Sequence, residues 1–555
     1  MPTITFSLRD LNNLIGKKLS IGELSKLIEY GKGELESYNS GSDEVIVNFD
    51  DTNLPYLWSV EGVARLIKGI LKKTKGIPPI KIKNGDYKIL VDKSVSSVRP
   101  YISAFVAKGY KVDDYLIKQI IQLQEKLCEN YGKRRLKVAI GVYSYEKIEF
   151  PIYYKATDPE SIKFVPLDFK KEMTQQEILE EHPKGKEYKW IIEQYKKYPI
   201  LIDSNNNVLS FPPIINSALT GKVVEGEEHL FVEATGTELE PIILATNIMA
   251  YALYERGFDI YSVEIKYPNK LIKTPLLSKD KIRIKKEQIK RLLGLELDNS
   301  KIKELLEMAG YNVVNNLQVE VPPYRKDILH PCDIVEDIGI MYGFDNIEEL
   351  PMRSYTIGET SDLVDFIDKV REIVIGLNFQ EVFSPVLTNK RILYDMMNIK
   401  DFGTIEIENF MSETYSCVRS WLLPILINFL SKNKHVGYPQ RIFEQGLVSV
   451  RKGKEIKEYE RIAIVSANEK ADYTEIKQIL DYIMRMLNID YSVEEVEHDS
   501  FIPGRVGRVI VKGKNIAFIG EISPVVLTNF GLEVPVVGLE LNLSDLFNLI
   551  YKCGD

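Results

Sequence analysis

The sequence has little cysteine, histidine or tryptophan, and it lacks long apolar runs. Of its 555 residues only four are cysteine, five histidine and three tryptophan. The cysteines lack C-x-x-C spacing, which argues against a zinc site or a disulfide scaffold and fits a reducing compartment. They are Cys128, Cys332, Cys417 and Cys553. No run of about 18 apolar residues is present, and the N-terminus has no signal-peptide pattern, so we expect a cytoplasmic protein without a membrane span.

The composition is that of a folded protein of several domains. Hydrophobic residues make up 45% of the chain and charged residues 27%, which are ordinary values. A chain of this length holds roughly three or four domains. Its net charge of −8 does not favour nucleic acid as a partner, although it leaves room for a local basic face. Strand-like and helical patterns are interspersed, which predicts a multidomain α+β fold.

The sequence contains an internal duplication. Residues 10–28 resemble residues 288–306, and the pattern of residues 45–66 returns at 319–341. Each copy predicts a helix, a turn, a helix, a strand and a helix, which indicates a duplicated unit of the helix-turn-helix type. When Glu61 is aligned with Glu336, Gly62 falls opposite Asp337. Since Trp58 also falls opposite Asp333, the acidic face is peculiar to the second copy.

These acids share one face of a predicted helix that begins near Pro331. Asp333, Glu336 and Asp337 are spaced i, i+3 and i+4, and Asp327 lies just upstream. Like charges this close repel, so they need a hard cation such as Mg²⁺ or basic groups on a partner. A solvated acidic helix start is the alternative. In either case, removing like charges from this face should not harm the unliganded helix.

A second candidate site lies within residues 86–272. Asn205–Asn207 predicts a hairpin turn between two short strands. Glu233 and Thr235 alternate with apolar residues and so point to the same face of a strand. A carboxylate and a hydroxyl beside a strand end predict a hydrogen-bonding pocket, with a half-exposed strand face as the alternative. Thr237 and Glu240 predict a capping box for the helix that follows.

The segment VPPYRKDILHPCDIVEDIGIMYGFDNI, residues 321–347, resembles the B5 domain of the phenylalanyl-tRNA synthetase beta-subunit family. It carries that family's V-P-x-x-R-x-D-I run, its D-I-x-E-D motif and its Y-G-F-D-N-I ending. The resemblance implies that Asp327, Asp333, Glu336 and Asp337 bind Mg²⁺ in a site shared with the alpha subunit.

Residues 86–272 resemble the B3/B4 domain of the archaeal/eukaryotic-type beta subunit, which hydrolyses tyrosine wrongly attached to tRNA(Phe). The resemblance implies a pocket lined by Leu201, Ser210, Glu233 and Thr235, although the carboxylate position is more usually Asp. The need for such a site is physical. An apolar pocket rejects a substrate that adds one hydroxyl by only about 10²-fold, so a second, hydrolytic site is warranted.

Residues 353–555 resemble the antiparallel core of class II aminoacyl-tRNA synthetases, with helices expected at 362–377 and 388–398 and strands at 381–384 and 404–407. The class II motifs are incomplete. Gly446 is not followed by F-R-x-E, and Leu541 replaces the arginine that ends motif 3. Loss of a cation that pairs with the triphosphate leaves its charge uncompensated. We expect this module to dock a catalytic partner and to make no aminoacyl-adenylate.

The resemblance covers essentially the whole chain and implies the domains 1–85 (B1-like), 86–272 (B3/B4 editing), 273–352 (B5) and 353–555 (catalytic-like). It implies an (alpha-beta)2 heterotetramer with the phenylalanyl-tRNA synthetase alpha subunit, which binds the ATP used to attach phenylalanine to tRNA(Phe). Two alternatives stay open from the residues: a free-standing editing hydrolase, and a non-enzymatic tRNA-binding protein built from helix-turn-helix units.

Overall fold

The computed structural model describes residues 2–352 and 354–551, and the chain divides into two compact units at Pro351/Met352. We call residues 1–351 unit 1 and residues 352–555 unit 2. Both units combine helices with sheets, which confirms the predicted α+β class. Within the described residues no helix is long and apolar enough to cross a membrane. Cys128, Cys332 and Cys417 are free thiols, and Cys553 lies outside the described residues.

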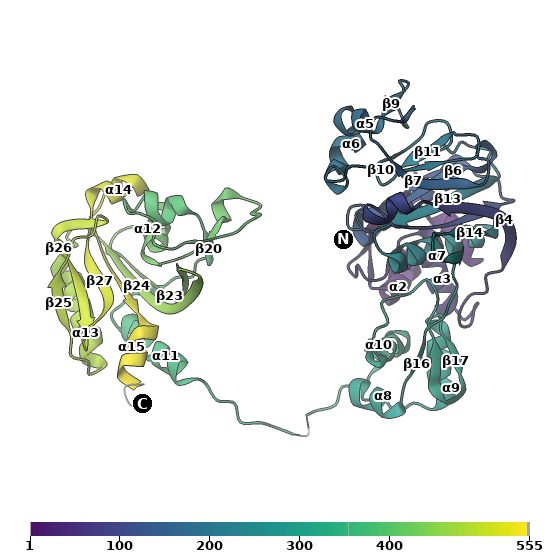
Figure 1. The fold of residues 1–555 in the computed structure, drawn as a ribbon. Coiled ribbons are helices and arrows are strands. Elements are labelled where there is room, and N and C mark those ends of the chain that lie inside the picture. The colour runs from purple at the N-terminus through teal and green to yellow at the C-terminus, as the bar shows by residue number, and fades with distance from the viewer. Residues whose placement is uncertain (1, 353, 552–555) are drawn as a thin grey trace. The chain divides into compact units, whose positions relative to one another are not determined.

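Unit 1 is organised around one large mixed sheet (Figure 1). Its strand order is β12-β11-β10-β7-β4-β14-β5-β13-β6, and β15 pairs with β14. Strands β4 and β14 pair in parallel, as do β4 and β7, and the other pairs are antiparallel. The strands are β4 (Ile82–Val91), β5 (Tyr101–Lys108), β6 (Ala139–Ser144), β7 (Ile152–Thr157), β10 (Tyr198–Ile202), β11 (Val208–Phe211), β12 (Ile215–Asn216), β13 (His229–Gly236), β14 (Asp259–Lys266) and β15 (Leu271–Thr274).

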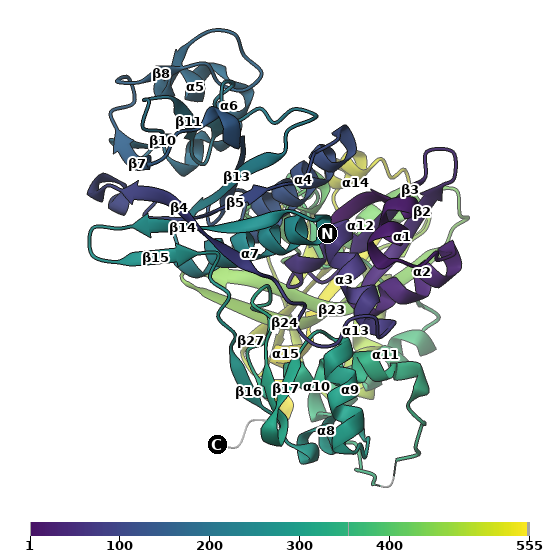
Figure 2. The same ribbon diagram turned by 90° about the vertical axis from the view of Figure 1, so that its right-hand side faces the viewer.

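Helices cover this sheet where its strands present apolar side chains. The helices are α4 (Asp114–Lys126), α5 (Gln175–Glu181), α6 (Pro183–Tyr188) and α7 (Leu239–Arg256). Helix α7 packs against β5, β13 and β14, and its central residues are buried. Helices α5 and α6 form a separate core with β10 and β11 and lie at that end of the sheet (Figure 2).

The predicted duplication is visible as two small domains with the same order of elements. The first copy contains β1 (Thr3–Ser7), α1 (Leu8–Ile15), α2 (Ile21–Ile28), β2 (Gly33–Asn39), β3 (Glu44–Phe49) and α3 (Val60–Ile70). The second contains β16 (Lys281–Arg283), α8 (Lys286–Leu293), α9 (Asn299–Met308), β17 (Asn312–Val314), β18 (Gln318–Glu320) and α10 (Pro331–Tyr342). Their sheets share one order, β1-β3-β2 and β16-β18-β17. Both copies therefore add two strands to the pattern that the sequence predicted.

Unit 2 is built on a sheet of order β19-β23-β24-β28-β27-β26-β25 with a hydrophobic core on each face. One core contains residues of α11, α13 and α15, and the other contains residues of α12 and α14. A small sheet, β20-β22-β21, accompanies it. The elements are α11 (Asp362–Gly376), β19 (Gln380–Glu381), β20 (Leu387–Thr388), β21 (Ile405–Glu406), β22 (Cys417–Val418), α12 (Leu423–Lys432), β23 (Gln440–Lys452), β24 (Glu455–Ala467), α13 (Tyr473–Met486), β25 (Ser492–Glu495), β26 (Phe501–Val511), β27 (Lys514–Ile522), α14 (Pro524–Phe530), β28 (Val536–Asn542) and α15 (Leu543–Tyr551).

Three local predictions were wrong. The expected helix at 388–398 is only a π-type turn, Arg391–Asp395, and the expected strand at 381–384 is reduced to β19. The predicted capping box at Thr237 is absent, because α7 begins one residue later and Glu238 occupies the N-cap without a side-chain bond. In each case short-range pattern was outweighed by the way neighbouring segments pack.

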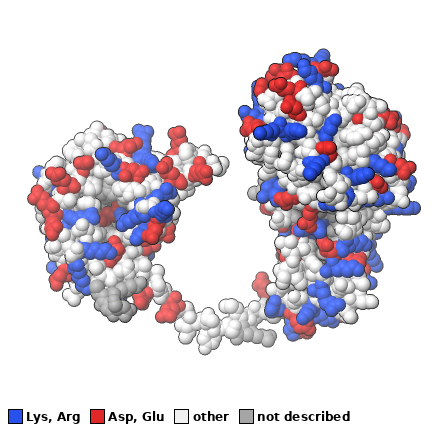
Figure 3. Space-filling model, in the orientation of Figure 1, with Lys and Arg blue, Asp and Glu red and all other residues white. Residues whose placement is uncertain are grey.

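Acidic and basic side chains intermingle on both units on the face that Figure 3 shows. Lys and Arg gather over the second copy in unit 1. Exposed basic residues of its first strand and first helix are Lys281, Arg283, Lys285, Lys286, Lys290 and Arg291. The net negative charge of the chain therefore coexists with a local basic strip.

Candidate functional site

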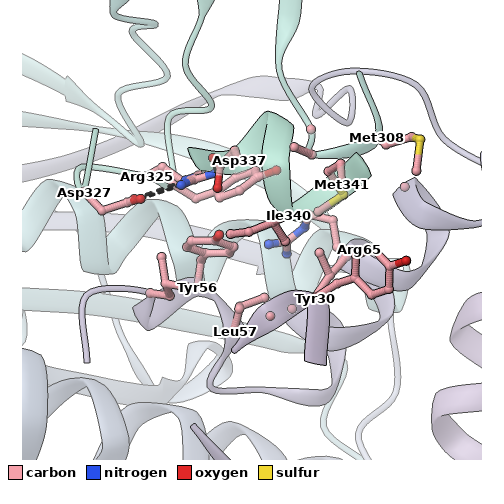
Figure 4. Close-up of a pocket in the computed structure, with 18 of the residues that line it drawn as sticks. Tyr30, Tyr56, Leu57, Arg65, Met308, Arg325, Asp327, Asp337, Ile340 and Met341 are labelled. Atoms are coloured by element: carbon pink, nitrogen blue, oxygen red, sulfur yellow. Dashed lines mark hydrogen bonds and ion pairs between the residues drawn. The ribbon is translucent and has the colours of Figure 1, made fainter. Parts of the chain in front are cut away.

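A cavity of about 280 Å³ lies between the two copies of the duplicated unit (Figure 4). The first copy contributes Tyr30, Tyr56 and Arg65 to its wall, and the second contributes Met308 and Arg325. All four acids that were predicted to bind a metal also line this cavity. The structure thus brings the predicted residues to one place, but the neighbours of each acid differ.

Arg325 lies between two of these acids and neutralises both. Its side chain is only 4% exposed, and its Nη1 lies 2.7 Å from Asp337 Oδ2. Its Nε and Nη2 donate to the two oxygens of Asp327 at 3.1 and 2.5 Å, which is a bidentate pair. Figure 4 shows the guanidinium between these carboxylates. Bidentate pairs of this kind are among the strongest charge-assisted hydrogen bonds.

Aromatic rings complete the surroundings of this ion cluster. The rings of Tyr56 and Tyr311 lie 5.3 and 5.2 Å from the Arg325 guanidinium, and the Tyr311 hydroxyl donates to Asp337. Burial raises the pKa of Asp337 above its ordinary value, while Arg325 and Tyr311 act against that rise. The carboxylate is therefore held in place by groups that satisfy its charge from within the protein.

Asp333 and Glu336 have different partners from this pair. Asp333 accepts hydrogen bonds from the backbone N–H groups of Leu329 and His330, both at 2.8 Å, and so caps α10. Burial opposes these bonds, but they hold the pKa of Asp333 below its ordinary value. The carboxylate of Glu336 is about half exposed and lies 2.8 Å from Lys32 of the first copy. Three acids that were expected to share one face thus have three separate roles.

The donors suit Mg²⁺, but their arrangement does not form a complete site. Carboxylate oxygens are the ligands that Mg²⁺ prefers. In the part of the chain that the structure describes, however, no three Asp, Glu, His or Cys side chains converge in a way that would hold a metal. Arg325 and Lys32 already compensate three of the four acids. These residues alone therefore do not provide a coordination sphere.

A second cavity, of about 470 Å³, lies at the edge strand β6 of the large sheet. Three of the four residues predicted for the editing pocket line it: Ser210 of β11 and Glu233 and Thr235 of β13. Leu201 is not part of this wall. It pairs with Ser210 across β10 and β11 and is fully buried in the hydrophobic core. The predicted hairpin turn is present, and Asp203 Oδ1 closes it by accepting from the N–H groups of Asn205 and Asn207.

Glu233 is the polar centre of this cavity. It is 3% exposed, and burial raises the pKa of its carboxyl to about 8. Its Oε1 lies 2.9 Å from the hydroxyl of Tyr143, which is 2.8 Å from Ser210 Oγ. Among the described residues, Glu233 Oε2 has no hydrogen-bond partner. A buried oxygen without a partner is costly, so a ligand that donates a hydrogen bond to it is favoured.

Thr235 is fixed from behind by a buried arginine. Arg99 is 1% exposed, and its Nε donates to Thr235 Oγ1 at 3.0 Å while its Nη2 donates to the Thr235 carbonyl at 2.6 Å. Because Oγ1 accepts from Arg99, the hydroxyl proton of Thr235 is left to donate elsewhere. Burial lowers the pKa of Arg99, and the nearby Tyr154 and Glu233 oppose that change.

Sequence reasoning did not identify Tyr143, Arg99 or Gly141. Gly141 lies opposite Glu233 in the β6–β13 register, and a Cβ on it would stand 2.2 Å from the Tyr143 hydroxyl and 2.6 Å from Glu233 Oε1. A larger residue at position 141 would therefore displace one of these two polar groups. Alternation within β6 places residues 141 and 143 on one face, but nothing in the sequence pairs β6 with β13.

In unit 2, Leu541 and several buried polar side chains are engaged by the protein's own contacts. Leu541 is fully buried in a hydrophobic core on β28. Glu540 accepts from the N–H groups of Leu422 and Leu423 at 2.9 and 2.8 Å. Arg419 and Glu444 form a buried ion pair at 2.5 Å. This geometry leaves no cation at position 541 for a triphosphate.

Comparisons with known proteins match both parts of the chain. The family described as tRNA synthetase B5 domain matches residues 282–344, and the phenylalanyl tRNA synthetase beta chain CLM domain matches residues 347–543. The phenylalanine–tRNA ligase beta subunits of Pyrococcus furiosus and Pyrococcus horikoshii are each 43% identical over 99% of this chain and 100% of their own length. That of Borreliella burgdorferi is 36% identical over 96% of this chain and 97% of its own length.

A solved structure agrees with these relatives. The N-terminal fragment of the phenylalanyl-tRNA synthetase beta subunit from Pyrococcus horikoshii is 42% identical, with a TM-score of 0.60, and covers 61% of this chain and 99% of that fragment. The motif-based resemblance is thereby confirmed over nearly the whole length. This chain belongs to the family of phenylalanine–tRNA ligase beta subunits, components of an aminoacyl-tRNA ligase.

Proposed function

We propose that this chain supports the ATP-dependent attachment of phenylalanine to tRNA(Phe) as a non-catalytic partner of an alpha subunit, in an (alpha-beta)2 heterotetramer. The observation that carries this proposal is the buried Leu541, which occupies the place of the motif 3 arginine. ATP would then bind on the alpha subunit. The alpha-subunit surface is expected on unit 2, where large apolar side chains are exposed. These are Phe383, Phe402, Phe410 and Met411.

The test is expression of the chain alone and together with its alpha subunit. We expect the chain alone to give no ATP–pyrophosphate exchange with phenylalanine, and the co-expressed pair to give exchange and to elute as a heterotetramer. Replacing Phe383 and Met411 with serine should reduce assembly, and Val525→Ser, at another exposed apolar side chain of unit 2, serves as the control. Exchange by the chain alone would disprove the division of labour.

We further propose that the cavity at β6 hydrolyses tyrosyl-tRNA(Phe). Water attacks the ester carbonyl, the bond to the ribose oxygen breaks, and tyrosine and free tRNA are released. Two features support a tyrosine-selective site: the buried carboxyl of Glu233 has an oxygen without a partner, and Thr235 retains a hydroxyl proton to donate. A phenol can bond to Glu233, whereas the ring of phenylalanine cannot.

Deacylation of preformed Tyr-tRNA(Phe) tests this second proposal. Above about pH 8, where Glu233 is ionised, we expect Glu233→Ala to slow deacylation by about 10-fold or more, because a charge-assisted hydrogen bond contributes about 1.5–3 kcal/mol. Synthesis of Phe-tRNA should stay unchanged in the same preparation. Equal deacylation rates for wild type and Glu233→Ala would show that this carboxyl does not select tyrosine.

We propose a Mg²⁺ site that contains the predicted ligands Asp327, Asp333, Glu336 and Asp337. Since these side chains do not converge by themselves, we propose that oxygen ligands from the alpha subunit complete the site. Glu336 is the exposed member and the one most available to a partner. Glu336→Gln should then weaken the Mg²⁺ dependence of assembly, while Asp345→Asn, at a neighbouring exposed acid, should not. Equal Mg²⁺ dependence of the two variants would argue against a shared site.

We also propose the division 1–85, 86–272, 273–352 and 353–555 into B1-like, editing, B5 and catalytic-like domains. The basic strip of the second copy, residues 281–291, is the surface proposed to contact tRNA phosphates. Replacing Lys285 and Lys286 should weaken tRNA binding uniformly and reduce its salt dependence, with no change in selectivity for tyrosine.

A further inference from the structure

A buried tyrosine, Tyr143, is hydrogen-bonded to two residues that line the cavity, Ser210 and Glu233. Tyr143 of β6 is fully buried, and its hydroxyl bridges Ser210 Oγ at 2.8 Å and Glu233 Oε1 at 2.9 Å. Its ring packs against Phe231, with centroids 5.6 Å apart. Gly141 provides the space in which hydroxyl and carboxyl meet. The side chain thus connects two residues of the proposed editing site while lying behind them.

We infer that Tyr143 is a positioning residue that engages one oxygen of Glu233 and leaves the other, Oε2, for the phenol of a tyrosyl group. This inference rests on the proposed editing function. A tyrosine hydroxyl has one proton, so its two contacts consist of one donation and one acceptance. When Glu233 is ionised, Tyr143 donates to Oε1 and accepts from the hydroxyl of Ser210. Both hydrogen bonds then run in one direction, with Ser210 donating to Tyr143 and Tyr143 donating to Glu233.

Other groups near Glu233 do not replace this contact. Arg99 influences the carboxyl through charge, but its donors are used by the Thr235 hydroxyl and by the carbonyls of Arg135, Leu136 and Thr235. The Tyr154 hydroxyl donates to the Arg99 carbonyl at 2.7 Å. The only side-chain hydrogen bond to Glu233 within the described residues is therefore the one from Tyr143. Without the Tyr143 hydrogen bond, the Glu233 carboxyl is free to rotate, and both of its oxygens are available to the phenol of the tyrosyl group.

The inference predicts a defined phenotype for Tyr143→Phe, which removes one oxygen and keeps the ring. We expect kcat/KM for deacylation of Tyr-tRNA(Phe) to fall by about 10-fold, as for loss of a hydrogen bond to a charged group. The pH profile should also move. Because the Tyr143 bond favours the ionised form of Glu233, its loss raises the pKa of that carboxyl and shifts the profile toward higher pH.

The matched control is Tyr267→Phe. Tyr267 is also a buried phenol of the same core, and its hydroxyl exchanges two hydrogen bonds with the backbone of Ile102, at 3.0 and 2.9 Å. This variant loses comparable bonds away from Glu233, so its deacylation rate and pH profile should match wild type. Gly141→Ala is a second test, because the added methyl group pushes the Tyr143 hydroxyl and Glu233 Oε1 apart. It should reproduce the Tyr143→Phe phenotype.

The full chain, assembled with its alpha subunit, is assayed on preformed Tyr-tRNA(Phe) over pH 6 to 9. A slower, shifted Tyr143→Phe variant beside a normal Tyr267→Phe variant supports the inference. A Tyr143→Phe variant with the rate and profile of wild type overturns it and leaves the editing proposal intact. A wild-type enzyme that does not deacylate Tyr-tRNA(Phe) overturns both.

Discussion

Glu233→Gln should alter the pH dependence of stability around β13 in a direction fixed by the structure. Burial raises the pKa of the Glu233 carboxyl from about 4.5 to about 8 in the folded chain. Between these values the folded state holds a proton that the unfolded state has released. Stability therefore falls as pH rises through this range and becomes constant above about pH 8. Glutamine is close in shape, stays neutral and still accepts from Tyr143, so it removes this pH-dependent loss.

The expected size follows from the same shift. Most of the change lies below the folded-state pKa, and between pH 6 and pH 8 it amounts to about 2 kcal/mol. The free energy of unfolding of Glu233→Gln relative to that of wild type should therefore rise by about 2 kcal/mol from pH 6 to pH 8. This change does not depend on the difference between the two proteins at pH 6. Other titrating groups are common to both proteins and cancel in the comparison.

Hydrogen exchange of the β13 amides in the full chain is the appropriate assay, because it reports this region without requiring the two units to unfold together. Wild type and Glu233→Gln are compared at pH 6, 7 and 8, and Glu336→Gln, at an exposed acid, serves as the control. If the difference in protection between wild type and Glu233→Gln is the same at all three values, Glu233 is already ionised at pH 6 and the reasoning is refuted.

Three further predictions follow from buried contacts. Asp337→Asn should destabilise unit 1 by about 3–5 kcal/mol in denaturant unfolding, because it leaves the charge of the buried Arg325 only half compensated. Glu336→Gln should cost less than about 1 kcal/mol, and an equal loss of unfolding free energy in the two variants would contradict this reasoning. Gly62→Ala should destabilise the protein by about 1–3 kcal/mol, since a Cβ there would lie 2.0 Å from the Tyr56 carbonyl oxygen. Gly22→Ala should be neutral or stabilising, because a Cβ there meets open space, and similar thermal midpoints for the two variants would refute the packing argument. Arg99→Lys should lower both the deacylation rate and the thermal midpoint, because an ammonium cannot donate to all four acceptors that the guanidinium reaches. An unchanged deacylation rate would show that Arg99 does not act through Thr235.

Patterned elements were predictable from the sequence. Helix α11 lies at the helix expected at 362–377, and β13 contains the strand expected around Glu233 and Thr235. The duplication was also recognisable, because each copy must bury the same faces. In unit 2, β21 lies within the strand expected at 404–407, but the strand expected at 381–384 is reduced to β19, which has two residues and is held by its partner β23. Such strands depend on long-range pairing that a local window does not contain.

The cavity around Glu233 was predictable only along its own strand. Alternation correctly placed Glu233 and Thr235 on one face, but the partners that set their chemistry come from far along the chain. Tyr143 lies 90 residues from Glu233 and Arg99 lies 136 residues from Thr235. Leu201 was predicted to line the same pocket. It pairs with Ser210 across two strands, but its side chain is buried in the hydrophobic core.

Within the acidic cluster, Asp327 and Asp337 already have a counterion in the protein. The second copy has Asp327 and Asp337, and between them it has Arg325, which binds both. The first copy has Gly62 at the position of Asp337, and residues 50–59 contain no arginine. Asp337 and Arg325 therefore occur together in the second copy, whereas the first copy has neither an acid at position 62 nor an arginine in residues 50–59. This argues that Asp327, Arg325 and Asp337 form one charge-balanced structural group. Because Asp337 pairs with the buried Arg325, we expect its removal to disturb the fold, and Glu336 is the position at which a metal or partner can be tested without that effect.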